Sequence, residues 1–226
     1  MVGRSVRPMR CASEAVTKAA SIADRNEASV AGIEGEAIRS HGNVEALPLA
    51  LDGVFLIKAR RFGDARGFFT ETYNRSDFVA VGIESVFVQD NQSFSAPRGT
   101  IRGLHFQTPP HAQAKLVRVL RGAILDVVVD IRRHSPTFGR HLAVELDHAE
   151  GRQLFVPEGF AHGFCTLTPD TEVFYKVTDV YAPLCDRGIA WNDPALGIDW
   201  PVDAADASLS EKDRRQPLLS EAESVF

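Results

Sequence analysis

Residues 124–131 have the sequence Ile-Leu-Asp-Val-Val-Val-Asp-Ile, in which every odd-numbered position is apolar. The even positions include Asp126 and Asp130. Successive side chains of a β-strand point to opposite faces, so this pattern predicts a strand with one face in a core. The other face is then available to line the lumen of a barrel.

Similar short runs of β-branched and aromatic residues continue from Pro48 onward, separated by Gly, Pro, Asn and Asp. Many strands with almost no helix between them favour an all-β fold, either a closed barrel or a double-sheet jelly roll. We also expect two short peripheral helices, one over 76–81 and one after Ser208, where Glu211 completes a capping box and Pro217 ends the turn. The expected strands are 54–59, 68–73, 85–89, 101–107, 116–120, 124–131, 141–146, 152–156, 163–167 and 172–180.

The first part of the chain differs in composition from the rest. Residues 1–47 are rich in Ala, Ser, Glu and Gly and show no sustained amphipathic stripe, which is typical of a flexible N-terminal extension. Residues 48–226 are long enough to bury a full core, and 44% of the whole chain is apolar. The sequence therefore predicts one domain over 48–226 preceded by an extension.

Charge and cysteine content exclude several classes of protein. The net charge is −5 and there is no run of Lys or Arg, so neither nucleic-acid binding nor attachment to a membrane surface is expected. No apolar run approaches the roughly 20 residues that span a bilayer. The three scattered cysteines, Cys11, Cys165 and Cys185, fit neither a disulfide framework nor a zinc site, which indicates a cytoplasmic protein.

The most informative polar cluster is Arg102-Gly103-Leu104-His105-Phe106-Gln107, followed by Lys115. A metal site is not predicted, because the position two residues after His105 is Gln107 and no Glu occurs between Gln107 and Ala143. An isolated histidine is usually a packed core residue. Here Arg102 and Lys115 lie nearby in sequence, and a base, a cation for an oxyanion and an anion anchor are what an enolising enzyme requires.

Six motifs occur in order along the chain: Phe62-Gly63-Asp64-Ala65-Arg66-Gly67-Phe68-Phe69, Val88-Gln89-Asp90-Asn91, Arg102 to Gln107, Val129-Asp130-Ile131-Arg132, Pro157-Glu158-Gly159-Phe160-Ala161-His162-Gly163-Phe164 and Trp191-Asn192-Asp193-Pro194. With these motifs the chain resembles the dTDP-4-dehydrorhamnose 3,5-epimerase family from about residue 54 to residue 219. This resemblance implies a cupin-type double-stranded β-helix, or jelly-roll barrel, that acts as a homodimer without metal or other cofactor. It further implies epimerisation at C3 and C5 of dTDP-4-keto-6-deoxy-D-glucose, a dTDP-4-keto-6-deoxyhexose, to give the L-rhamnose precursor.

The resemblance assigns catalytic roles to four residues. His105 matches the general base, and Asp213 matches the carboxylate that orients it. Lys115 matches the cation that stabilises the enolate oxygen, and Tyr175 matches the acid that returns a proton from the opposite face of the ring. From the sequence alone, Asp213 and Lys115 would be solvated surface charges and Tyr175 a packing residue.

Other matching positions are expected to contact the substrate. Arg66 and Arg102 match diphosphate or sugar anchors, for which a planar guanidinium is well shaped. His162 matches a second pocket histidine, and Asp126 is the candidate for its orienting carboxylate. The remaining matches, which line the nucleotide and sugar pocket, are Phe69, Glu71, Gln89 and Asn91.

Some alternatives stay open. Asp186 occupies a position where many family members carry Glu, in a loop whose role the sequence does not define. Related enzymes that invert only C3 retain nearly the same residues and differ in how Tyr175 is aimed, so the sequence does not separate double epimerisation from a 3-epimerase or a 5-epimerase. A sugar-nucleotide-binding cupin without catalytic activity and a metal-dependent cupin are further possibilities. The expected homodimer forms through strand exchange near the barrel's edge, which also covers an exposed β edge.

Overall fold

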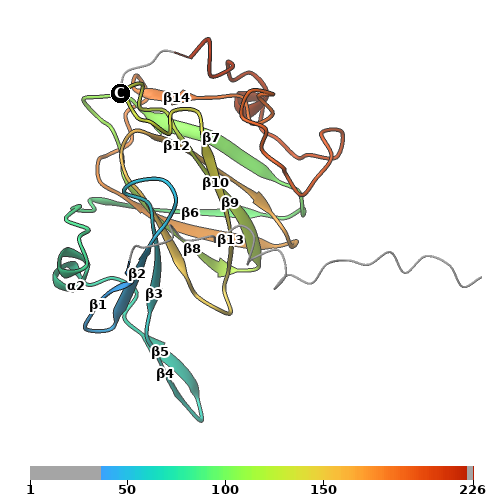
Figure 1. Ribbon diagram of the computed structural model, residues 1–226. Helices are drawn as coiled ribbons and strands as arrows, with labels where there is room; N and C mark the ends of the chain where they lie inside the picture. The colour runs from blue at the N-terminus through green and yellow to red at the C-terminus, as the bar shows by residue number, and fades with distance from the viewer. Residues whose placement is uncertain (1–36, 223–225) are drawn as a thin grey trace, which may run out of the picture.

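The computed structural model describes residues 37–222 and residue 226, and two antiparallel sheets dominate it (Figure 1). The larger sheet has seven strands. In spatial order they are β1 (Arg39–His41), β2 (Val44–Pro48), β3 (Phe55–Ala59), β11 (Gln153–Val156), β8 (Lys115–Arg121), β13 (Thr171–Val177) and β6 (Gln89–Ser95).

The second sheet has five strands, and the remaining elements are peripheral. The order of this sheet is β10 (His141–Asp147), β9 (Ala123–Asp130), β12 (Phe160–Thr166), β7 (Ile101–Gln107) and β14 (Asp186–Gly188). A separate hairpin of β4 (Arg61–Asp64) and β5 (Gly67–Thr70) projects from the body of the molecule (Figure 1). The described helices are α2 (Arg75–Ala80) and α3 (Glu211–Arg214).

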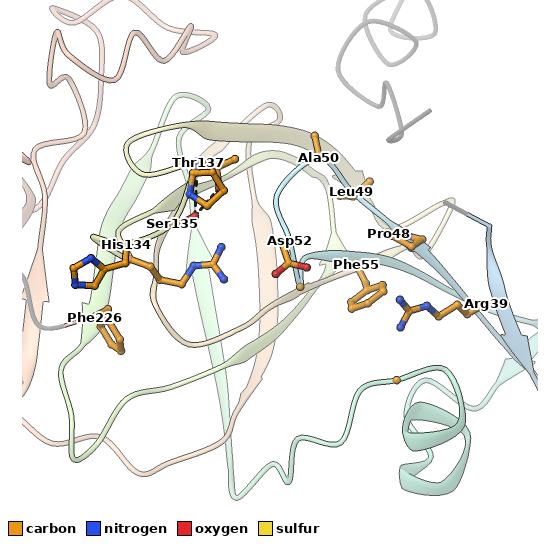
Figure 2. Close-up of a pocket in the computed structure, with 14 residues that line it drawn as sticks. Arg39, Pro48, Leu49, Ala50, Asp52, Phe55, His134, Ser135, Thr137 and Phe226 are labelled. Atoms are coloured by element: carbon orange, nitrogen blue, oxygen red, sulfur yellow. Dashed lines mark hydrogen bonds between the residues drawn. The ribbon is translucent and has the colours of Figure 1, made fainter. Parts of the chain in front are cut away.

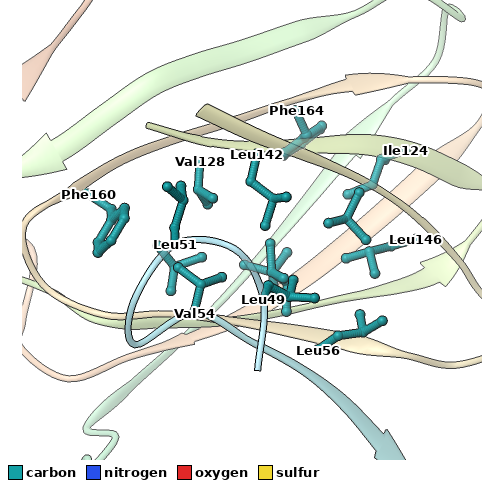
Figure 3. Packing of buried hydrophobic residues seen from close by; sticks show 14 of the residues in the cluster. Leu49, Leu51, Val54, Leu56, Ile124, Val128, Leu142, Leu146, Phe160 and Phe164 are labelled. Atoms are coloured by element: carbon teal, nitrogen blue, oxygen red, sulfur yellow. The ribbon is translucent and has the colours of Figure 1, made fainter. Parts of the chain in front are cut away.

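The main core lies between the two sheets (Figure 3). Val117, Leu154 and Val173 come from the larger sheet, and Ile124 and Val128 come from β9 of the smaller one. Each of these side chains is at most 1% exposed, so the apolar faces are removed almost completely from water. Two antiparallel sheets closed over such a core form the predicted jelly roll, and the prediction of an all-β fold is confirmed.

Strand β9 behaves as its alternating sequence predicts. Leu125, Val127 and Val129 pack in a second cluster, which contains residues of the C-terminal segment such as Leu196. The even positions face inward, where Val128 joins the main core and the side chain of Asp126 is fully buried. The inner face of β9 therefore carries both core packing and a charged group.

Strand β6 shows where the sequence prediction was wrong. A strand was expected over 85–89, but β6 begins at Gln89 and runs to Ser95. Its residues Gln-Asp-Asn-Gln-Ser-Phe-Ser are almost entirely polar, so hydrophobic alternation did not reveal them. The inward side chains of Gln89, Asn91 and Ser93 line a polar cavity instead of an apolar core.

The expected boundary at residue 47 differs from the structure, because it falls inside β2. Strand β2 pairs antiparallel with β3, and its Val44 and Ala46 are at most 3% exposed. The edge strand β1 precedes it, with Arg39 opposite Ala46. Short alternation over only five residues, next to an exposed edge strand, gave too weak a signal for detection. Residues 1–36 of the expected extension lie outside the described residues.

Both expected helices are present with shifted ends. α2 starts after Asn74, whose side chain accepts a hydrogen bond from Ser76 N, and Phe78 anchors it in the core. α3 is capped by Ser210 rather than by Ser208, and it ends before Pro217. This shift in the cap places Asp213 on the inner side of the helix, where it is only 4% exposed.

Candidate active site

A polar cavity of about 580 Å³ opens between the two sheets. Strands β6, β8 and β13 line one side, β7, β12 and β14 line the other, and α3 closes the rim. Most of the predicted site residues meet here. They are His105, Lys115, Tyr175, Asp213, Gln89, Asn91, Arg102 and His162.

The first feature of the cavity is a histidine–aspartate pair. His105 Nε2 lies 2.5 Å from Asp213 Oδ1. The His105 side chain is 31% exposed toward the cavity, whereas Asp213 is buried behind it. Burial raises the pKa of Asp213, but hydrogen bonds from His105 and Ser210 outweigh that effect and hold the pKa below its usual value. Asp213 therefore stays ionised and fixes the orientation of the imidazole.

The helix cap holds Asp213 in this position. Ser210 Oγ donates to Asp213 Oδ2 at 2.7 Å and accepts from the Asp213 backbone amide at 3.1 Å. Gly103 on β7 also donates a backbone hydrogen bond that lowers the pKa of Asp213. A Cβ on Gly103 would lie 2.5 Å from the Cα of Gly163, so only glycine allows β7 and β12 to approach so closely. Ser210 was not predicted as a site residue.

Lys115 begins β8 and faces the His105 strand. Its Nζ donates to the backbone oxygen of His105 at 3.0 Å, and the residue is only 8% exposed. Burial lowers the pKa of Lys115 to about 8, although the charges of Asp126 and Asp186 act in the opposite direction. An ammonium so poorly solvated is well suited to stabilise a negative oxygen that forms in the cavity.

A second histidine–aspartate pair lies beside the first. His162 on β12 is directly opposite His105 on β7, and its Nε2 is 2.5 Å from Asp126 Oδ1. Burial lowers the pKa of His162, and the nearby Asp126 counteracts this change. Asp126 is the partner of His162 and does not line the cavity.

Tyr175 and Arg102 contribute from different sheets. Tyr175 lies on β13 opposite Asn91 of β6, packs against the main core, and has its pKa raised by burial. The phenol consequently keeps its proton at neutral pH. Arg102 donates from Nε to Ser95 Oγ at 3.1 Å and from Nη2 to the Phe94 oxygen at 2.9 Å, which holds its guanidinium at the cavity wall.

Two side chains on the cavity wall connect neighbouring segments of the chain. Gln89, which is expected to contact substrate, lines the cavity, accepts a hydrogen bond from the backbone amide of Tyr181 at 3.0 Å and donates one to Asn91 at 2.9 Å. Asp186 accepts from Tyr181 Oη at 3.0 Å and from Lys212 Nζ at 2.5 Å. Asp186 therefore connects the rim of the cavity to α3. In the sequence, the only indication of this role is that Lys212 is adjacent to Asp213.

Besides Asp126, three predicted contacts lie outside this cavity. Arg66 and Phe69 lie in the β4–β5 hairpin, where Phe69 is 69% exposed and the Arg66 side chain is 90% exposed. Glu71 follows the same hairpin. None of the three lines the cavity of its own chain. Arg66 pairs with Asp64 within the hairpin at 2.5 Å.

A second cavity, of about 910 Å³, is lined by none of the predicted site residues (Figure 2). Arg39, Asp52 and Phe55 lie on one side of it, and His134 and Phe226 lie on another. His105, Lys115, Tyr175 and Asp213 all line the other cavity.

Two further classes of site are absent from residues 37–222 and 226. No group of three or more His, Cys, Asp or Glu side chains there is arranged to hold a metal ion. Within the same residues, no helix has both the length and the apolar character needed to cross a bilayer.

Known proteins resemble this chain over most of its length. Residues 48–221 match the family model described as dTDP-4-dehydrorhamnose 3,5-epimerase. A curated enzyme of that name from Sinorhizobium fredii is 51% identical over 173 residues, which cover 76% of this chain and 88% of the relative.

Solved structures give the same result. The Bacillus anthracis dTDP-4-dehydrorhamnose 3,5-epimerase with TDP and PPi bound is 50% identical, with a TM-score of 0.75, and the match covers 77% of this chain and 99% of that one. The Legionella pneumophila dTDP-6-deoxy-D-glucose-3,5-epimerase in complex with dTDP-4-keto-L-rhamnose is 41% identical, with a TM-score of 0.76. That match covers 80% of this chain and 95% of that one.

Proposed function

The chain belongs to the dTDP-4-dehydrorhamnose 3,5-epimerase family and is an isomerase, and we propose that it converts dTDP-4-keto-6-deoxy-D-glucose to dTDP-4-keto-L-rhamnose. This reaction inverts C3 and C5, the two carbons that flank the C4 ketone. The ketone acidifies both protons, so one base and one oxyanion stabiliser serve both positions. The product places the enzyme in dTDP-L-rhamnose biosynthesis.

We propose that His105 is the base for both carbons. Asp213 holds Nε2 of the ring at 2.5 Å, which leaves Nδ1 to take the proton from the substrate. The ionised carboxylate also stabilises the imidazolium that forms. The electrons of the broken C–H bond then move to the C4 oxygen and give an enolate.

Lys115 and Tyr175 complete the reaction. The buried ammonium of Lys115 stabilises the enolate oxygen, an interaction that strengthens as the charge develops. Tyr175 then donates its proton to the carbon from the face opposite His105. Inversion requires a donor on that face, because reprotonation by His105 would restore the original configuration.

The observation that carries this proposal is the arrangement of His105 and Tyr175 on opposite sheets around one cavity. The test is NMR of dTDP-4-keto-6-deoxy-D-glucose in deuterated water with a chelator present. We expect the C3 and C5 protons both to exchange and dTDP-4-keto-L-rhamnose to appear. Loss of both exchanges in the His105→Ala variant would identify the base.

The same experiment separates the competing functions. Exchange and inversion at C3 alone, or at C5 alone, would identify a single epimerase of another deoxysugar pathway. Binding without exchange would identify a sugar-nucleotide-binding cupin. Activity that is lost with the chelator and restored by a metal would contradict the proposed reaction, in which His105 and Lys115 supply the base and the cation.

We propose that the active form is a homodimer in which the β4–β5 hairpin reaches the cavity of the second copy. The predicted pocket residues Arg66, Phe69 and Glu71 belong to this segment but do not line their own cavity. The hairpin pairs with neither large sheet, and its Phe68 is 59% exposed. A second copy would cover these aromatic side chains and supply them for nucleotide binding.

We further propose that the enzyme works in the cytoplasm. The described cysteines, Cys165 and Cys185, are both free, as expected for a reducing compartment.

A further inference from the structure

The carboxylate of Asp126 is fully buried, but only one of its two oxygen atoms has a hydrogen-bond partner among the described residues. Its residue is 0% exposed on β9, and Oδ1 is 2.5 Å from His162 Nε2. Oδ2 is buried without a hydrogen-bond partner among the described residues. A single neutral or partly charged donor does not neutralise a carboxylate, so the charge of Asp126 acts strongly on its surroundings.

Lys115 is connected to this carboxylate through two neighbouring contacts. His162, which lies 2.5 Å from Asp126, is directly opposite His105 on β7, and Lys115 Nζ donates to the backbone oxygen of His105. Burial is the main influence on the Lys115 ammonium and favours loss of its proton, and Asp126 is the largest of the influences that favour keeping it. Among the described residues, the hydrogen-bond partner of Lys115 Nζ is the backbone oxygen of His105, which is neutral. The other ionisable groups around the Lys115 ammonium, which influence its pKa or line the same cavity, are His162, His105, Asp186 and Lys212.

We propose that Asp126 is a positioning residue whose fixed negative charge keeps Lys115 protonated during turnover. The inference rests on the proposed function, in which the Lys115 ammonium stabilises the enolate oxygen. Substrate binding removes water from the cavity and would further favour the neutral amine. A carboxylate that already lies behind His162 opposes that loss without occupying space needed by the sugar.

The first test compares the pH dependence of kcat for the wild type and for Asp126→Asn. We expect the alkaline limb of the variant to move to lower pH by about one unit, because an opposite charge nearby shifts a pKa by about that amount. KM should change little. The ratio of wild-type to variant kcat would therefore grow as the pH rises, whereas a ratio that is constant with pH would overturn the proposal.

Asp130→Asn is the matched control. Asp130 lies four residues further along β9, on the same face, and is equally buried. Its carboxylate, however, forms an ion pair with Arg132 at 2.8 Å and accepts hydrogen bonds from Ser135 and Thr137. We expect this variant to be less stable but to keep the wild-type alkaline limb. An equal displacement in both variants would show a general effect of buried charge and would overturn the specific role of Asp126.

A second readout does not depend on turnover. The chain has five lysines, so NMR of protein labelled with [ε-¹³C]lysine gives few signals, and the Lys115→Met variant assigns the one of interest. We expect the pKa of Lys115 to be lower in Asp126→Asn than in the wild type. Asp126→Ser, which also offers His162 an acceptor, gives the same comparison if the Asn variant does not fold.

The two readouts separate failure of this inference from failure of the proposed function. An unchanged Lys115 pKa would overturn the inference whatever the activity. A lowered pKa together with an unchanged alkaline limb would show that turnover does not need the ammonium, which would overturn both the inference and the enolate role of Lys115. If the Asp126→Asn variant has a lowered Lys115 pKa but the wild type exchanges no substrate proton, the influence of Asp126 on Lys115 stands and the proposed function is refuted.

Discussion

The Nε2 atom of His105 and the Oδ1 atom of Asp213 lie 2.5 Å apart, although 108 residues separate them in the sequence. β7 supplies the histidine, and a four-residue helix near the end of the chain supplies the aspartate. Because Ser210 bonds both the amide and the carboxylate of Asp213, the position of the base depends on this small helix cap.

Replacement of Asp213 by Asn should greatly reduce catalysis. The amide cannot hold the His105 ring in the same protonation state or stabilise the imidazolium, so we expect kcat/KM to fall by at least about 10²-fold. Steady-state assays and C–H exchange should show the same loss. The Ser210→Ala variant should lose less, because it weakens the support of Asp213 but keeps the carboxylate. Equal losses in both variants would indicate that α3 unfolds.

Tyr175→Phe should separate proton exchange from inversion. His105 and Lys115 remain in place, so the variant should still exchange substrate protons with deuterated water. Without the donor on the opposite face, formation of the epimerised product should fall by about 10²–10⁴-fold. NMR of one reaction mixture measures both quantities. Parallel loss of exchange and inversion would contradict the assignment of Tyr175 as the acid.

Turnover should fall as the pH rises through about 8. Burial lowers the pKa of Lys115 to about 8, and the protonated form is the one that stabilises an enolate. Burial raises the pKa of Tyr175, so its phenol keeps its proton over this range and does not produce the limb. The measurement is kcat against pH. In Lys115→Arg the alkaline limb should disappear, because a guanidinium does not titrate there, even if kcat is reduced.

The sequence predicted the jelly roll well because most of its strands obey local rules. β7 was predicted with its observed ends, and the alternation in β9 identified both of its faces. β6 was misplaced because its inner face serves the cavity and therefore lacks apolar residues. Alternation reports burial in a core, so strands that line a polar site are the ones it misses.

The site was predictable only in part from the residues themselves. His105, Arg102 and Lys115 lie close together in sequence, which indicated acid–base chemistry. Asp213 looked like a surface acid, because its burial depends on the contact between α3 and β7 across the fold. Composition and spacing do not report such contacts, and only resemblance to a family identified it. The link from Asp186 to Lys212 was missed for the same reason.

Asp130 should make stability depend on pH in strong acid. Burial raises its pKa, but hydrogen bonds from Arg132, Ser135 and Thr137 lower it to about 2, against an ordinary value of 3.8. This depressed pKa gives stability that is complete above pH 4 and is lost as the pH falls through about 2, amounting to about 2 kcal/mol. Urea unfolding of the wild type and Asp130→Asn should therefore differ more at pH 5 than at pH 2. A constant difference would contradict the ionised state of Asp130.

Mixed dimers should reveal whether the β4–β5 hairpin serves the partner's cavity. Phe69→Ala and His105→Ala should each be nearly inactive alone, the first through the hairpin and the second through the base. In a hybrid dimer one cavity would combine an intact His105 with an intact hairpin from the other copy, and the second cavity would carry both defects. Random exchange of equal amounts should thus restore about a quarter of the wild-type activity.

Exchange of His105→Ala with Tyr175→Phe is the control, because both residues line the same cavity of one chain. Every cavity in that mixture then carries one defect, and no activity should return. Light scattering must show a dimer in each sample. If the hairpin served its own chain, each cavity in the first mixture would also carry one defect, so the absence of restored activity there would refute the exchange of hairpins between copies.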